Sequence, residues 1–192
     1  GIAYDPSNGY IYVTNLCFKT VYVINSTTYR VVNEIFVGYC PEGVAYIPSN
    51  GYIYVANDGS ATVSVINPNT NQVVTNIKVG NGPTSIVYDS RNGYVYVTDY
   101  GSNAVSVINP NTNQVVTNIS VGDKPWGITY DPSNGYIYVA NFGSGTVSVI
   151  DPNTNQVVSN IPVGKGLDGI AFAPPNGYIY VASYETGMVY VI

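Results

Sequence analysis

One tripeptide, Asn-Gly-Tyr, recurs along this chain at a constant spacing of 42 residues. Longer segments also recur unchanged: PSNGYIYV begins at Pro6 and Pro132, and NPNTNQVVTNI begins at Asn67 and Asn109. The five copies of the tripeptide begin at Asn8, Asn50, Asn92, Asn134 and Asn176. A fixed period of this length is typical of repeat architectures, so the chain is expected to fold as one small structural unit used several times.

Each unit shows the alternation of a β-sheet. Apolar residues recur with period two, and Val, Ile, Thr and Tyr dominate, while no segment keeps a helical period, so we predict strands and no helix. In the fourth unit the expected strands are 127–130, 136–140, 146–150 and 156–161. Asn-Gly pairs and Asn-Pro segments between them predict tight turns. Each unit is therefore predicted to be a four-stranded antiparallel sheet.

The predicted fold class is all-β, a β-propeller of four-stranded blades, because the period lies in the range usual for such blades. One sheet cannot bury both of its faces, so neighbouring blades must stack around an axis. A β-sandwich, the alternative, gives no reason for a constant repeat length. We treat residues 1–192 as a single propeller domain or propeller fragment, divided into units 1–42, 43–84, 85–126, 127–168 and 169–192.

The fifth unit stops after its third strand, at Ile192, and so lacks an outer strand. Seven units would need about 294 residues. The chain is then either a five-bladed ring with an incomplete blade or a fragment of a larger propeller, and we favour the fragment. An unpaired edge near Tyr190 would attract a strand from another segment or chain, which makes self-assembly through the last blade a hypothesis.

Composition excludes several classes of function. The net charge is −5, with six Lys and Arg against eleven acidic residues, so a nucleic acid is not an expected partner. No apolar run is long enough to cross a bilayer. The chain has no His, which removes Ser-His and Cys-His nucleophiles and HExxH zinc sites. We predict no enzyme, no cofactor and no metal site, although Asp and Asn ligands for calcium are abundant.

A binding face is predicted from strand direction. Since successive strands run in opposite directions, the loops after the second and fourth strands share one face, where the repeats differ most. Relaxed drift in loops would produce the same variation. The sole Trp, Trp126, is expected just before the innermost strand and is the first contact candidate. The other candidates are the aromatic residues Tyr100, Phe142 and Tyr184 and the charged residues Asp123, Lys124 and Asp168.

Two further features concern covalent chemistry. Cys17 and Cys40 are expected in loops that flank one blade on the same face, so a disulfide between them is predicted, with two free thiols as the alternative. Closing a loop of about 22 residues would contribute about 3 kcal/mol and imply an oxidising compartment. Asn25 and Asn118 begin glycosylation sequons, consistent with export.

YVTN at Tyr12, with its variants YVAN at Tyr54 and Tyr138, YVTD at Tyr96 and YVAS at Tyr180, resembles the motif of the YVTN-repeat β-propellers. That family is common in archaeal surface-layer and other secreted cell-surface proteins, and its fold is related to lactonase-type propellers. The resemblance implies a secreted or cell-surface, non-catalytic module with a structural, assembly or adhesive role that binds protein or glycan through its variable loops. The alternative is a propeller-type hydrolase or lyase that uses rim carboxylates, for instance Asp123 with Asp168.

Overall fold

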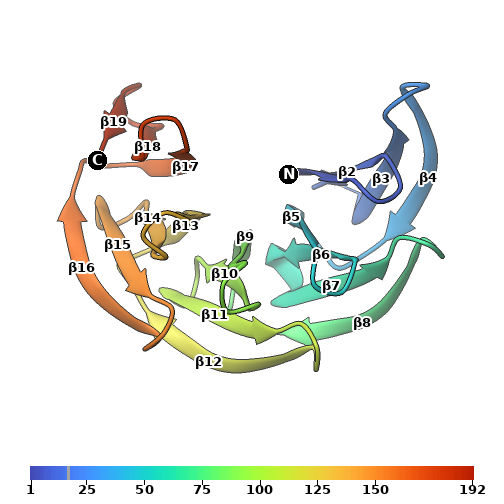
Figure 1. The fold of residues 1–192 in the computed structure, drawn as a ribbon, viewed down its shortest axis with the longest axis horizontal. Coiled ribbons are helices and arrows are strands. Elements are labelled where there is room, and N and C mark those ends of the chain that lie inside the picture. Colours follow the sequence, from blue (N-terminus) through green and yellow to red (C-terminus); the bar gives the residue numbers. More distant parts are fainter. Residues whose placement is uncertain (17) are drawn as a thin grey trace.

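A computed structural model describes residues 1–16 and 18–192 of the chain as an all-β structure. The described residues form five antiparallel sheets, four with four strands and one with three. The sheets are arranged as blades around one axis, each with its first strand near the centre and its last strand at the periphery (Figure 1). The blades form an arc that is open between the first and the fifth.

The strands follow one another in space in the order of the sequence within every blade. The first blade contains β1 (Ile2–Asp5), β2 (Tyr10–Asn15), β3 (Thr20–Asn25) and β4 (Arg30–Phe36). The second contains β5 (Pro41–Ile47), β6 (Tyr52–Asn57), β7 (Thr62–Asn67) and β8 (Gln72–Lys78). The third contains β9 (Pro83–Tyr88), β10 (Val95–Asp99), β11 (Ala104–Asn109) and β12 (Gln114–Ser120). The fourth contains β13 (Pro125–Tyr130), β14 (Ile137–Asn141), β15 (Thr146–Asp151) and β16 (Gln156–Pro162), and the fifth β17 (Leu167–Ala173), β18 (Tyr178–Ser183) and β19 (Val189–Val191).

Two details correct the sequence-based expectations. The loop between β6 and β7 contains a single 3-10 turn, η1 (Asp58–Ser60), although no helix was predicted. The innermost strand of the fourth blade begins at Pro125, earlier than predicted, because Pro125 still pairs with Asn141 across a register shift. Trp126 therefore lies inside the innermost strand and not before it.

The hydrophobic core lies between blades. Val21 and Val23 of the first blade pack with Ile53 and Ile66 of the second. The same arrangement recurs between the second and third blades, third and fourth, and fourth and fifth. Burial of one sheet against the next is the stacking that the apolar alternation predicted.

The loops gather on two faces of the arc, as the alternating strand direction requires. The turn face carries the loops between the first and second and between the third and fourth strands of each blade. The rim face carries the loops between the second and third strands and the connections to the next blade. On the turn face, the Oδ1 atoms of Asp5, Asp89 and Asp131 each accept an N–H from two residues further on, at 2.8, 2.8 and 2.7 Å. These residues start the turns as expected of Asx residues.

Turn-face side chains also join one blade to the next. Asn50 Nδ2 donates to Tyr54 Oη at 3.1 Å, and Tyr54 Oη donates to Asn113 Oδ1 of the third blade at 2.6 Å. Asn50 also donates to the carbonyl of Pro110, at 3.1 Å. Asn-Gly-Tyr therefore shapes a hairpin and links two neighbouring sheets.

The two end blades leave apolar side chains uncovered. Ile2 of β1 is 70% exposed, whereas Val44 and Ile128, at the same place in later blades, are 9% exposed. In the fifth blade Val189 is 63% exposed, whereas Val147 is fully buried. These are the surfaces that meet a neighbouring blade elsewhere in the arc.

Candidate functional site

Three of the predicted contact residues form an aromatic cluster on the rim face, made of Tyr100, Trp126 and Phe142. The Tyr100 and Trp126 rings meet edge to face with centroids 5.4 Å apart, and the Trp126 and Phe142 centroids are 6.4 Å apart at a tilt of 45°. The three side chains come from the third blade's β10–β11 loop, from β13 and from the fourth blade's β14–β15 loop. All three are partly exposed, so the cluster offers ring surface to a ligand.

The backbone of Trp126 is held by the preceding blade. Its carbonyl oxygen accepts hydrogen bonds from Thr84 Oγ1 at 3.0 Å and from Thr98 Oγ1 at 2.8 Å. Gly127, the next residue, passes so close to the carbonyl of Asp168 that a Cβ atom there would collide with it. These contacts fix the position from which the indole projects.

Lys124 adds a cation to the aromatic cluster. Its Nζ lies 5.7 Å from the centroid of the Tyr100 ring, within the range of a cation–π interaction. Lys124 adopts a left-handed backbone with φ of 54°, a conformation that Gly82 and Gly166 supply at the same place in other blades. A lysine in that conformation costs about 1 kcal/mol, and such strain is found preferentially at functional sites.

Asn103 organises the polar side of the cluster, and sequence reasoning missed it. Its Oδ1 accepts the backbone N–H of Lys124 at 2.9 Å, and its Nδ2 donates to Asp123 Oδ1 at 3.2 Å. These residues, together with Tyr100, line a hollow of about 420 Å³. The sequence could have pointed to Asn103, because the other units have Lys19, Ala61 or Gly at the same position.

A second hollow, of about 330 Å³, lies beside the inner strands. Trp126 and Gly127 line it with Asp168, Gly169 and Ser85. Trp126 lines this second hollow, whereas Tyr100, whose ring it contacts, lines the first. Asp123 and Asp168 line different hollows, so the structure does not bring the two carboxylates of the glycosidase alternative into one cavity.

The remaining candidates lie elsewhere. Tyr184 is 79% exposed in the β18–β19 loop of the fifth blade and, among the described residues, makes no ring contact with the cluster. The predicted disulfide involves Cys17, which lies outside the described residues; Cys40 has no disulfide partner among those described. Asn25 Oδ1 accepts the N–H groups of Thr27 and Thr28, while Asn118 is exposed on β12. Glycosylation at either residue stays a prediction.

The described residues contain neither a metal-binding cluster nor a membrane-spanning helix. In residues 1–16 and 18–192, no group of three or more His, Cys, Asp or Glu side chains is placed to hold a metal ion. Over the same ranges, no helix has the length and apolar character needed to traverse a bilayer.

A buried carboxyl group beneath the rim face, Asp99, was also missed by sequence reasoning. It stands where β6 and β14 carry Asn57 and Asn141. Both amides donate to a serine, and that serine donates to an asparagine on the outer strand: Asn57 Nδ2 to Ser64 Oγ at 2.9 Å, then Ser64 Oγ to Asn76 Oδ1 at 2.7 Å. The sequence could have pointed to Asp99, because the third unit has YVTD where other units have YVTN or YVAN.

In the third blade, with the Asn118 amide oriented as it is in the structure, this chain of hydrogen bonds is complete only when Asp99 carries a proton. Ser106 Oγ lies 2.6 Å from Asp99 Oδ2 and 2.9 Å from Asn118 Oδ1, but a hydroxyl has one hydrogen to donate. A protonated Asp99 completes the chain by donating to Ser106. Burial raises the pKa of Asp99 to about 6, although the hydrogen bond from Ser106 opposes that shift.

Comparison with known proteins supports the fold. The structure is similar to Kuenenia stuttgartiensis hydrazine synthase, with a TM-score of 0.87 and 27% identity over 94% of this chain and 54% of that one. It is also similar to a functionally unknown protein from Desulfotomaculum acetoxidans DSM 771, with a TM-score of 0.80 and 14% identity over 96% of this chain and 65% of that one. The chain thus spans less than two thirds of each. No protein-family model and no curated protein matches it. The five sheets and these similarities define a propeller-like all-β protein.

Proposed function

We propose that this chain is a non-catalytic binding module that acts outside the cell or at the cell surface and holds a protein or glycan on the aromatic cluster of Tyr100, Trp126 and Phe142. The observation that carries the proposal is the position of Trp126. Its backbone is fixed by Thr84 and Thr98, and its ring is flanked by two aromatic rings. Trp126 lines the hollow at the inner strands, and its neighbour Tyr100 lines the hollow on the rim.

The chemistry of the cluster suits such a ligand. Aromatic rings supply contact area at small entropic cost, and sugar rings or apolar peptide side chains pack against their faces. Lys124, Asp123 and Asn103 surround the rings with donors and acceptors that give orientation. The YVTN-like motifs and the sequons are in keeping with secretion, and the secreted location is part of the proposal.

The test uses the fact that Trp126 is the only tryptophan. A glycan array and a cell-surface protein pull-down identify the ligand class, and titration of that ligand should then change the Trp126 fluorescence in a saturable way. Trp126→Phe should weaken binding about tenfold and Trp126→Ala more, because hot-spot aromatics contribute about 2 kcal/mol or more.

Tyr184→Ala is the matched control, because it removes an exposed aromatic ring in a rim-face loop outside the cluster. It should leave the affinity unchanged. Equal loss in Tyr184→Ala and Trp126→Ala, or turnover of a lactone or glycoside that Asp168→Ala abolishes, would overturn the proposal in favour of another surface or of the hydrolase alternative.

We also propose that the arc belongs to a larger propeller built on the 42-residue unit, in which further units cover the end blades. The support is the exposure of Ile2 and Val189. The place of Ile2 is at least partly buried in the middle blades, and the place of Val189 is fully buried there. Concentration-dependent association of the isolated chain, measured by sedimentation velocity and reduced by Val189→Lys, would support this. A chain that stays monomeric at high concentration and gains no stability from an appended outer strand of the type 151–166 would contradict it.

A further inference from the structure

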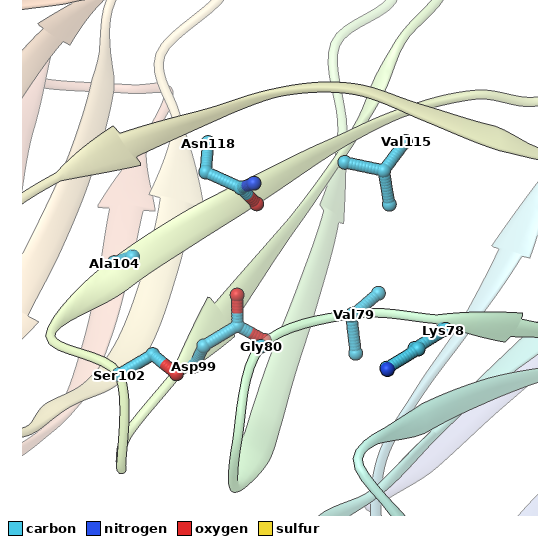
Figure 2. Close-up of a pocket in the computed structure, with 8 residues that line it drawn as sticks. All are labelled: Lys78, Val79, Gly80, Asp99, Ser102, Ala104, Val115 and Asn118. Atoms are coloured by element: carbon cyan, nitrogen blue, oxygen red, sulfur yellow. The ribbon is translucent and has the colours of Figure 1, made fainter.

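A departure from the repeat lies in a hollow of about 440 Å³ between the second and third blades. Figure 2 shows its lining: the carboxyl group of Asp99 and the amide of Asn118 on one side, Val79 and Val115 on the other, and Lys78 at the edge. Ala104, Gly80 and Ser102 complete it. The hollow lies apart from the aromatic cluster, and no residue of that cluster lines it.

A sister hollow between the first and second blades serves as an internal comparison. It measures about 320 Å³. Its lining residues lie 42 positions before residues that line the larger hollow, and five of them are of the same type: Val37, Gly38, Ser60, Val73 and Asn76. Two of its positions differ in size or polarity: Phe36 takes the place of Lys78, and Thr62 that of Ala104. Next to it, Asn57 occupies the place of Asp99 and donates to both Thr62 and Ser64. The third blade has therefore exchanged an amide for an acid and lost a hydroxyl beside it.

These exchanges leave the larger hollow rich in acceptors. Asp99 is fully buried, and its Oδ1 has no hydrogen-bond partner among residues 1–16 and 18–192. Asn57 and Asn141 leave their Oδ1 atoms equally unpartnered, but those are neutral amide oxygens. When Asp99 is ionised, its Oδ2 and the Oδ1 of Asn118 compete for the one hydrogen of Ser106, so a further acceptor is left without a donor.

The charge of Asp99 also lacks a counter-ion. The segments around it present Ser106 from β11, Asn118 from β12, Ser102 from the β10–β11 loop and Gly80 from the connection after β8. Lys78 is the one charged residue besides Asp99 in the lining, and it is exposed at the edge. A buried carboxylate without a cation is costly, so a bound cation that brings N–H donors would be strongly favoured.

We propose that this hollow binds the ammonium end of an alkylamine, either a free amine or a lysine side chain of a partner. The ammonium donates to Asp99 and to Asn118 Oδ1, and the alkyl chain lies on Val79, Val115 and Ala104. An ammonium carries three donors, which matches the acceptors that Ser106 cannot serve. The raised pKa of Asp99 makes the site proton-linked, because the amine replaces the proton that completes the chain of hydrogen bonds at lower pH.

The test is an NMR titration of the folded chain with n-butylammonium chloride at pH 7.5. Signals of Asn118, Val79 and Val115 should shift and saturate, while those of Asn76, Val37 and Val73 in the sister hollow should not. n-Butanol, the neutral analogue, should produce no saturable shift. The apparent dissociation constant should be about tenfold larger at pH 5, where about a tenth of Asp99 is ionised.

Variants separate this site from its alternatives. Asp99→Asn should abolish the shifts, and Asn57→Asp with Thr62→Ala should create the same response in the sister hollow. Lys78→Met removes a competing cation and should keep or tighten binding. Titration with a lysine-containing tripeptide blocked at both ends distinguishes a protein side chain, which then binds at least as tightly as butylammonium, from a free amine. Equal shifts in Asp99→Asn, loss of binding in Lys78→Met or no saturable shift would overturn the proposal.

Discussion

The turn face and the rim face both bury carboxyl groups, but they surround them differently. On the turn face, Asp131 accepts hydrogen bonds from both the backbone N–H and the hydroxyl of Ser133, at 2.7 and 2.6 Å. Beneath the rim face, Ser106 Oγ is the only side-chain hydrogen-bond partner of Asp99 in the part of the chain that the structure describes. Sequence-local partners hold the first group, whereas the second depends on strands that come together only in the folded sheet.

This difference extends to whole loops. Turn-face loops repeat the same Asx and Asn-Gly contacts from blade to blade. On the rim face the same loop-to-loop place is filled by Lys19 over the Tyr39 ring, at 3.5 Å, in one blade pair and by the Asn103–Asp123 hydrogen bond in another. The scaffold therefore keeps its geometry on one face and varies its chemistry on the other.

The largest predicted effect is a dependence of stability on pH that comes from Asp99. Because its pKa rises from 3.8 to about 6 on folding, the folded state holds the proton more tightly than the unfolded state. The stabilisation is fully present below pH 3.8 and is lost as the pH rises to about 6, a change of about 3 kcal/mol. Urea denaturation from pH 3.5 to 7.5 should show this loss in the wild type relative to Asp99→Asn.

The matched control for that measurement is Asp99→Asn with Ala104→Thr, which rebuilds the side chains of the sister hollow. Its stability should follow that of Asp99→Asn across the pH range. If the wild type and both variants change in parallel with pH, the pKa of Asp99 does not rise on folding.

On the turn face, Asp131→Ala should lower the free energy of unfolding by about 2 kcal/mol, because it leaves the N–H and hydroxyl of Ser133 without their acceptor. Asp131→Asn, which keeps an acceptor oxygen, should lose less. Chemical denaturation measures both. Our comparison assigns Asp131 a purely structural part on the turn face. A change in ligand binding at the rim face in Asp131→Ala would contradict it.

Tyr54→Phe should cost about 1.5 kcal/mol, since the variant leaves Asn113 Oδ1 of the next blade without a donor. Tyr52→Phe, two residues earlier on the same strand, is the control and should cost less. Thermal unfolding followed by circular dichroism can compare them. Equal effects would mean that the hydroxyl of Tyr54 does not link the blades.

The smallest effect is a gain. Ala61 ends η1 with φ of 51°, where Gly145 and Gly187 occupy the same place in later blades. Ala61→Gly should stabilise the chain by about 0.5 kcal/mol, because a left-handed backbone is costly for alanine. Gly145→Ala should do the reverse and by more, since its Cβ would crowd the carbonyl of Gly164. The unfolding midpoints of the two variants give the sign of each change in stability. A lower stability in Ala61→Gly would show that the backbone entropy of glycine outweighs the relief of strain.

The sequence predicted the strands closely because their evidence is local. Period-two alternation placed β15 and β16 within one residue of their observed bounds, and Asn-Gly turns fixed the hairpins. The aromatic cluster was predicted in part, since three of its four candidate rings meet. Tyr184 could not be sorted from the others, because equivalent loop positions look alike until the arc determines which blades are neighbours.

What the sequence alone determined is the blade, because alternation and turn chemistry act between residues a few positions apart. The tertiary structure decided which of the repeated positions meet, because those contacts join residues on different strands or blades, from 7 to 59 positions apart. Asp99 is the clearest example. In the sequence, Asp99 differs from the Asn of the other units by one small substitution. The folded sheet surrounds it with Ser106, Asn118 and the space left by Ala104, which makes it a buried acid without a counter-ion among the described residues.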